Sequence, residues 1–105
     1  MPHDEVFEAM STAFEGGAPV ALATVAQTLG STPRKTGAKM LVREDGSFVG
    51  TIGGGCGEAE VWQEAMDTLE DGEARMVTVD LTEPVDGEDK ICGGVMRIFV
   101  EKLEA

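Results

Sequence analysis

The chain has 105 residues, which is enough for one small globular domain with a single hydrophobic core. Its 20 acidic and 8 basic residues give a net charge of −12. This charge excludes general binding to nucleic acids or anionic membranes, because both need a positive protein surface. No apolar run is long enough to span a membrane, and the first residues do not read as a signal peptide. We therefore expect a cytoplasmic protein whose two cysteines are free thiols.

The first half of the chain predicts one helix followed by three strands. Apolar residues recur at helical spacing over residues 4–15, and a Gly-Gly pair follows them. Residues 20–27 are almost all apolar and include β-branched side chains, which is typical of a strand buried on both faces. Residues 38–43 and 47–52 flank a Glu-Asp-Gly turn, so they predict a β-hairpin whose first strand turns Ala38, Met40 and Val42 to one side.

The second half predicts a helix and two further strands. The helix covers residues 58–69 and is closed by Asp71-Gly72. Alternating strands are expected over residues 74–81 and 95–101, with an acidic loop over residues 82–90 between them. The whole order predicts an α/β fold of the α+β type, with a mixed β-sheet of about five strands and two helices packed on it. A doubly wound dinucleotide-binding fold does not fit in this length.

A basic loop is the first of three candidate ligand-binding clusters. Four of the eight basic residues lie between positions 34 and 43, a stretch that contains no acid. Arginine and lysine beside hydroxyl groups and glycines can hold a phosphate or another anionic group. The alternative is that these cations are ordinary surface ion-pair partners on an acidic protein. The candidate residues are Ser31, Thr32, Arg34, Lys35 and Lys39.

A glycine-rich loop with a cysteine is the second cluster. A glycine run this dense indicates that the backbone comes very close to another segment or to a ligand. The loop follows a predicted strand and opens a predicted helix, so its N–H groups point to one spot. It is neither a Walker loop nor a Gly-x-Gly-x-x-Gly fingerprint, because Glu58 stands where the third glycine should be. The candidate residues are Gly53, Gly54, Gly55 and Cys56.

Glu58 argues against a simple phosphate site at this helix start. A carboxylate in the first turn complements the helix dipole and repels an anion. It does suit the paired N–H donors of a pterin or guanine edge. Our hypothesis is that Glu58 binds such an edge, while backbone amides and the basic loop hold the anionic end of the ligand. The alternative is that Glu58 only complements the dipole.

The third cluster is Cys92-Gly93-Gly94, which precedes the last predicted strand. A helix amino terminus favours the thiolate form of cysteine, so Cys56 is the better candidate for a reactive thiol than Cys92. The alternative for both is a small buried hydrophobic residue. The single histidine, His3, lies at the amino terminus, which argues against a Cys-His dyad and a structural zinc site. We therefore expect a ligand carrier and not an enzyme.

Taken in order, these motifs resemble the amino-terminal domain of the XdhC/CoxI family, which are accessory proteins of molybdenum hydroxylases. The motifs that carry the resemblance are Gly30-Ser31-Thr32-Pro33-Arg34-Lys35, residues 37–42, residues 50–56 with Glu58, and Cys92-Gly93-Gly94. Family members commonly carry a Rossmann-like carboxy-terminal domain as well, and we expect residues 1–105 to form a single XdhC/CoxI-like domain without it. Gly57 stands where a bulkier residue is common, which we expect to loosen the helix start.

The resemblance implies a molybdenum cofactor-binding accessory protein. Such a protein holds the cofactor, a molybdopterin, as cargo while a cysteine desulfurase supplies sulfur, and then delivers it to an apo molybdenum hydroxylase of the xanthine dehydrogenase or carbon monoxide dehydrogenase type. Cys56 would supply a soft thiolate near molybdenum or act as a sulfur relay. The resemblance also implies a homodimer and a separate Rossmann-domain subunit as a further partner.

Two other functions fit the residues. In one, the chain is a thiol sulfur carrier that forms a persulfide on Cys56 or Cys92. In the other, it is a non-catalytic interaction module whose acidic face docks a basic partner, and its glycine loops serve only the fold.

Overall fold

The computed structural model describes residues 5–30, 32, 35–53, 57–82 and 93–104. It contains the two helices and five strands that the sequence predicts, in the predicted order. Neither helix of the described part of the chain has the length and apolar content needed to cross a membrane. The elements are α1 (Glu5–Gly16), β1 (Val20–Leu29), β2 (Lys39–Arg43), β3 (Phe48–Gly50), α2 (Glu58–Asp71), β4 (Arg75–Asp80) and β5 (Val95–Leu103).

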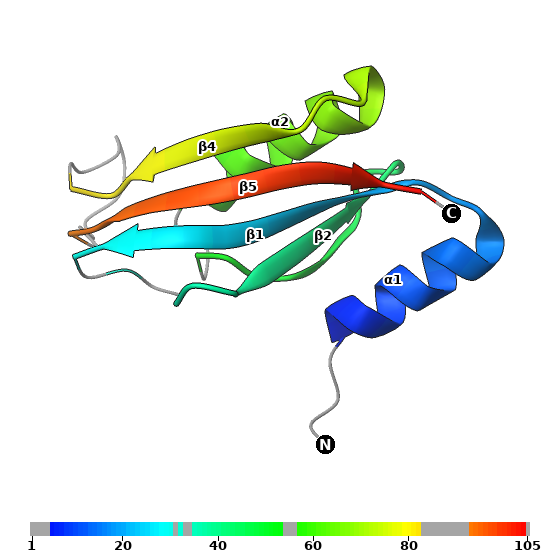
Figure 1. The fold of residues 1–105 in the computed structure, drawn as a ribbon, viewed down its shortest axis with the longest axis horizontal. Coiled ribbons are helices and arrows are strands. Elements are labelled where there is room, and N and C mark those ends of the chain that lie inside the picture. The colour runs from blue at the N-terminus through cyan, green and yellow to red at the C-terminus, as the bar shows by residue number, and fades with distance from the viewer. Residues whose placement is uncertain (1–4, 31, 33–34, 54–56, 83–92, 105) are drawn as a thin grey trace.

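The five strands form one open sheet in the order β3-β2-β1-β5-β4 (Figure 1). Every neighbouring pair is antiparallel, so the expectation of a mixed sheet was wrong. The reason lies in the one helical crossover of the sheet, β3-α2-β4. It joins two strands that run in the same direction, but they lie at opposite edges with three strands between them. No parallel pair can therefore form hydrogen bonds.

The main core lies between α2 and one face of the sheet. The alternation of β4 and β5 places Val77, Val79, Met96, Ile98 and Val100 on this face. The buried stripe of α2 packs on them through Val61, Ala65 and Leu69. As predicted, α2 ends before Gly72, whose N–H donates a hydrogen bond to the Thr68 carbonyl oxygen at 2.8 Å with a left-handed φ of 75°.

α1 covers part of the opposite face and forms a second, smaller core. This core joins Val6 and Ala9 of the helix to Val20 and Leu22 of β1 and to Leu41 of β2. The first part of β1 is thus buried on both faces, as expected. Its last residues are more exposed, because α1 contacts the sheet mainly over β2 and β3 and does not reach the carboxyl end of β1.

Strand β2 is also buried on both faces. Met40, Leu41 and Val42 are each fully buried, with Met40 and Val42 on the α2 side and Leu41 on the α1 side. The sequence pattern placed one side of this strand in the core and did not predict the burial of the other side. The second core layer that α1 supplies is the physical reason.

The contact between α1 and the sheet requires a glycine at position 50. Gly50 has a φ of +86°, and a Cβ atom there would lie 2.5 Å from the Lys39 carbonyl oxygen. The same atom would lie 2.6 Å from Cγ2 of Val6 on α1. Any side chain at position 50 therefore pushes α1 and the β2-β3 pair apart.

Replacing Gly50 by alanine should lower the free energy of unfolding by about 2–4 kcal/mol. Two costs add up here: alanine in a left-handed conformation, and the steric clash of its Cβ atom with Lys39 and Val6. Gly72→Ala is the matched control. Gly72 has a φ of +75°, and no atom lies within 4 Å of the place that its Cβ would take, so only the conformational cost of about 1 kcal/mol applies. Urea denaturation of the two variants measures both losses. Equal losses in the free energy of unfolding would show that the close approach of other atoms to Gly50 does not add to the destabilisation.

Candidate functional site at one end of the sheet

The strand directions bring the three predicted clusters to one end of the molecule. Strands β1, β3 and β4 run in one direction, and β2 and β5 run in the other. The carboxyl ends of the first three and the amino ends of the other two therefore share one end of the sheet. We call it the site end; it is on the left in Figure 1. Segments 30–38, 51–57 and 81–94 all connect elements at this end.

Backbone contacts bring the first and third clusters together. Gly30 follows β1, and a Cβ atom there would lie 3.2 Å from the Gly93 carbonyl oxygen and 3.5 Å from the Gly94 Cα atom. Gly93 and Gly94 are in turn held by Leu81, which accepts the Gly93 N–H at 2.9 Å and donates to the Gly94 carbonyl at 2.8 Å. The basic loop thus starts directly beside the glycine pair that precedes β5.

The second cluster joins this end through the start of α2. Gly57 is the N-cap of the helix, with a left-handed φ of 74° and no side-chain cap. A Cβ atom at Gly57 would lie 2.5 Å from Cγ1 of the buried Val79 on β4. The expectation that this glycine loosens the helix start therefore misses its role, since a larger residue here would force the helix away from β4.

Glu58 is held by residues on the other side of the glycine loop. Its Oε2 atom accepts a hydrogen bond from the Thr51 hydroxyl at 2.6 Å and one from the Ile52 backbone N–H at 3.4 Å. These bonds tie the first turn of α2 to the end of β3, so that both ends of the loop are held together. This structural role was not predicted, and the binding of a pterin edge by Glu58 stays a prediction.

The structure describes part of the basic loop. Lys35 is exposed, and Thr32 and Lys39 are half-buried. The Lys39 ammonium group donates to the Gly37 carbonyl oxygen at 3.0 Å, which keeps its positive charge at the site end. Arg43 lies at the far end of β2, opposite Val20, and donates to the Ser47 hydroxyl at 3.2 Å. The structure thus separates Arg43 from the other cations of the basic stretch.

Seven of the predicted site residues belong to the described part of the chain, and all of them lie at the site end. They are Thr32, Lys35, Lys39, Gly53, Glu58, Gly93 and Gly94. The other six lie outside the described residues: Ser31, Arg34, Gly54, Gly55, Cys56 and Cys92. Among the described residues, no group of three histidine, cysteine or acidic side chains is arranged to hold a metal ion.

Local hydrogen bonds set the electrostatics around the site end. Asp80 ends β4, and its carboxylate accepts the hydroxyl of Thr82 at 2.5 Å and the N–H of Thr82 at 2.9 Å. These bonds, the hydroxyl first, lower the pKa of Asp80 below its usual value. At the other end of α2, the N–H of Glu73 and then the guanidinium of Arg75 lower the pKa of Asp71. The pKa values of both acids therefore lie below that of an ordinary aspartate.

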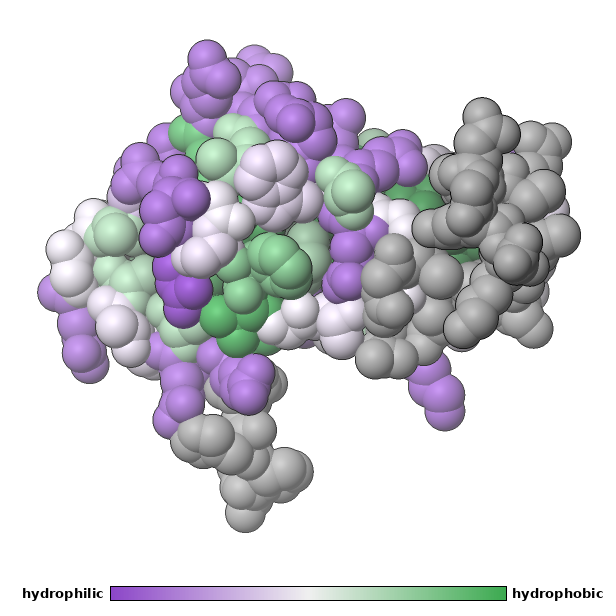
Figure 2. Space-filling view, turned by 180° about the vertical axis from the view of Figure 1, so that it is seen from behind, coloured by the Kyte–Doolittle hydropathy of each residue, from purple (hydrophilic) through white to green (hydrophobic). Residues whose placement is uncertain are grey.

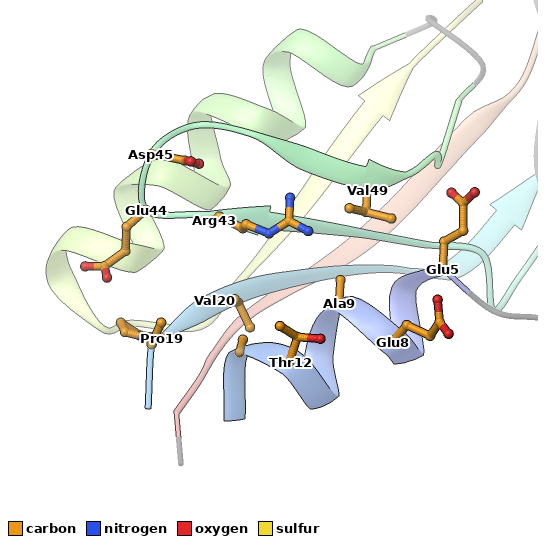
Figure 3. A pocket seen from close by; sticks show the side chains of 12 residues that line it. Glu5, Glu8, Ala9, Thr12, Pro19, Val20, Arg43, Glu44, Asp45 and Val49 are labelled. Atoms are coloured by element: carbon orange, nitrogen blue, oxygen red, sulfur yellow. The ribbon is translucent and has the colours of Figure 1, made fainter. Parts of the chain in front are cut away.

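Two of the cavities in the described part of the chain lie on opposite sides of the hairpin, and the sequence predicted neither. The larger, about 710 Å³, lies between α1 and the β2-β3 hairpin, at the end of the sheet opposite the site end (Figure 3). Arg43 and several carboxylates surround it, including those of Glu5, Glu8, Glu44 and Asp45. The smaller, about 380 Å³, lies between the hairpin and α2 and reaches Glu58. Only the smaller cavity adjoins the candidate site.

Comparisons with known proteins agree with this architecture. The chain is 30% identical over 103 residues, 98% of its length, to the molybdenum cofactor insertion chaperone PaoD of Escherichia coli K12. It is 31% identical over 78% of its length to a probable xanthine dehydrogenase subunit of Bacillus subtilis 168. It is 40% identical over 82% of its length to the uncharacterized protein YqeB of Escherichia coli K12.

A solved structure shares the fold. The chain superposes on a crystal structure of a xanthine dehydrogenase from Bacillus halodurans with a TM-score of 0.79 and 31% sequence identity, over 92% of this chain and 30% of the other. The chain spans only 32% of the length of PaoD, 26% of the Bacillus subtilis protein and 16% of YqeB. The family model of the XdhC and CoxI family matches residues 13–80. This chain therefore belongs to the XdhC and CoxI family.

Proposed function

We propose that this chain binds the molybdenum cofactor as cargo and acts in the maturation of a molybdenum hydroxylase. The observation that carries the proposal is the convergence of the three clusters at the site end, in a chain that aligns over 98% of its length with a molybdenum cofactor insertion chaperone. The cofactor combines a pterin, a phosphate and a molybdenum centre. Its binding therefore needs cations, hydrogen-bonding backbone groups and a soft ligand in one place.

The residues of the site end fit these three needs. Lys35 and Lys39 supply positive charge for the phosphate in a chain whose net charge is −12. Ser31, Thr32 and Arg34 extend this group along the sequence, and Gly93 and Gly94 lie directly beside Gly30, which precedes them. Cys56 comes two residues before Glu58 in the sequence, and in our proposal its thiolate serves as the soft ligand to molybdenum.

The proposal extends to the steps before and after binding. The chain holds the cofactor while a cysteine desulfurase supplies the sulfur ligand, and it then delivers the cofactor to a hydroxylase of the xanthine dehydrogenase or carbon monoxide dehydrogenase type. Since the relatives are at least three times longer, a Rossmann-like partner or segment would complete the machinery. The protein would work in the cytoplasm and as a homodimer.

Anaerobic titration with molybdenum cofactor, followed by gel filtration and measurement of bound molybdenum, tests the proposal. We expect stoichiometric binding, with affinity lowered about tenfold or more in Cys56→Ala because a metal ligand is lost. Lys35→Ala should weaken binding about fivefold through loss of a phosphate contact. Arg43→Ala is the matched control, because it removes the same charge at the opposite end of β2. Absence of binding by the unaltered chain would refute the proposal.

A double-mutant cycle tests the structural role of Glu58. Thr51→Val and Glu58→Ala each remove one partner of the 2.6 Å hydrogen bond. We expect a coupling energy of about 1–2 kcal/mol in the free energy of unfolding, because one partner is charged. Additive losses would mean that this bond contributes nothing to stability.

The same residues separate the structural role of Glu58 from its role in binding. If Glu58 accepts the N–H groups of the pterin edge, Glu58→Gln should weaken cofactor binding, while Thr51→Val should leave it nearly unchanged. Equal effects of the two variants on affinity would contradict a direct contact between Glu58 and the pterin.

A further inference from the structure

The smaller cavity is an apolar groove that leads into the site end. It runs from the hairpin turn at Gly46 to the first turn of α2 at Glu58, and its volume of about 380 Å³ is in the range of small-molecule sites. Figure 1 shows α2 passing behind the sheet, and Figure 2 shows the molecule from that side. On this face hydrophobic residues gather near the middle, with hydrophilic ones above them and to their left. The groove is lined by Met40, Gly46, Phe48, Glu58, Ala59 and Trp62.

Two aromatic side chains from different elements line this groove. Phe48 lies on the edge strand β3 and is 52% exposed. Trp62 lies on α2, one turn after Glu58, and its indole N–H donates to the Gly46 carbonyl oxygen at 2.8 Å. This bond fixes the indole ring, while the exposed ring of Phe48 is accessible to what enters the groove.

The absence of a side chain at Gly46 keeps the turn close to the indole. A Cβ atom at this position would lie 3.3 Å from Cζ2 of Trp62. The hairpin turn therefore closes one end of the groove, and Glu58 and Ala59 form the other. The walls between them are almost entirely apolar side chains. Such a groove favours a flat ring system, because aromatic side chains stack on rings and apolar walls exclude water.

We infer that this groove holds the pterin ring of the cargo. The inference rests on the proposed function and names the part of the cofactor that binds between the hairpin and α2. A pterin is a flat, fused heterocycle with an amino group and ring N–H donors. Glu58 is the charged residue of the groove and has the carboxylate oxygens that such donors need. The groove and the site end share Glu58.

The chain carries its own probe for this site. Trp62 is the only tryptophan and there is no tyrosine, so tryptophan emission reports on the groove alone. Titration with 6-hydroxymethylpterin, which has neither phosphate nor metal, should quench this emission to saturation, after correction with free N-acetyltryptophanamide. The complete molybdenum cofactor should quench it as well, and at lower concentration.

Variants of the exposed aromatic residue give the decisive comparison. Phe48→Ala and Phe48→Leu should each weaken binding of the pterin at least fivefold, because stacking on the ring is lost in both. Phe48→Leu keeps an apolar side chain of similar volume, so it controls for a change in the structure of the hairpin. Phe7→Ala is the matched control, since Phe7 is 60% exposed on α1 and lies outside the groove. Its pterin affinity should equal that of the unaltered chain.

Two results would separate failure of the inference from failure of the proposed function. Stoichiometric molybdenum binding, with unchanged Trp62 emission and unchanged affinity in both Phe48 variants, would overturn the inference and leave the carrier function intact. Lack of binding of both the cofactor and the pterin would overturn both. Saturable quenching that depends on Phe48 would support the groove as the pterin site.

Discussion

The pairing of β1 with β5 is the contact on which the rest of the structure depends. It joins strands from the two ends of the chain over nine registered positions, from Val20 opposite Leu103 to Leu29 opposite Val95. Strands β2 and β3 attach to one side of this pair and β4 attaches to the other. Because β5 runs against β1, the amino end of β5 must lie beside the carboxyl end of β1. That single fact places Gly93 next to Gly30 and so creates the site end.

The elements of the fold could be predicted because burial leaves a periodic trace in the sequence. The alternation of Val77 and Val79 marks β4, and the helical spacing of Ala65 and Leu69 marks α2. Which strands pair, and in which direction, leaves no such trace. The sheet was therefore expected to be mixed, and the pattern of β2 gave no sign that a second helix would bury Leu41. Both facts depend on contacts between segments far apart in the chain.

The composition of the site end could be predicted better than its geometry. Dense glycines and an island of cations stand out in an acidic chain, so residues such as Lys39 and Gly93 were found from sequence. The bond between Thr51 and Glu58 was not, since the two residues flank a loop whose path no periodicity describes. The position of Trp62 in the sequence fits the face of α2 that packs on the main core. Its indole ring also forms one wall of a groove. This role depends on the position of the hairpin, which the sequence does not show.

The two cores of the protein are very unequal, and this has a consequence for its motions. α1 buries only Val6 and Ala9 in the small core, whereas α2 is packed against four strands and closed by Gly72. Local stability follows the amount of buried apolar contact. The amides of α1 should therefore exchange with solvent through a local opening of low free energy, while those of β1 and β5 exchange only when the whole domain unfolds. Such an opening would uncover Leu41 and the cavity beside Arg43 without disturbing the site end.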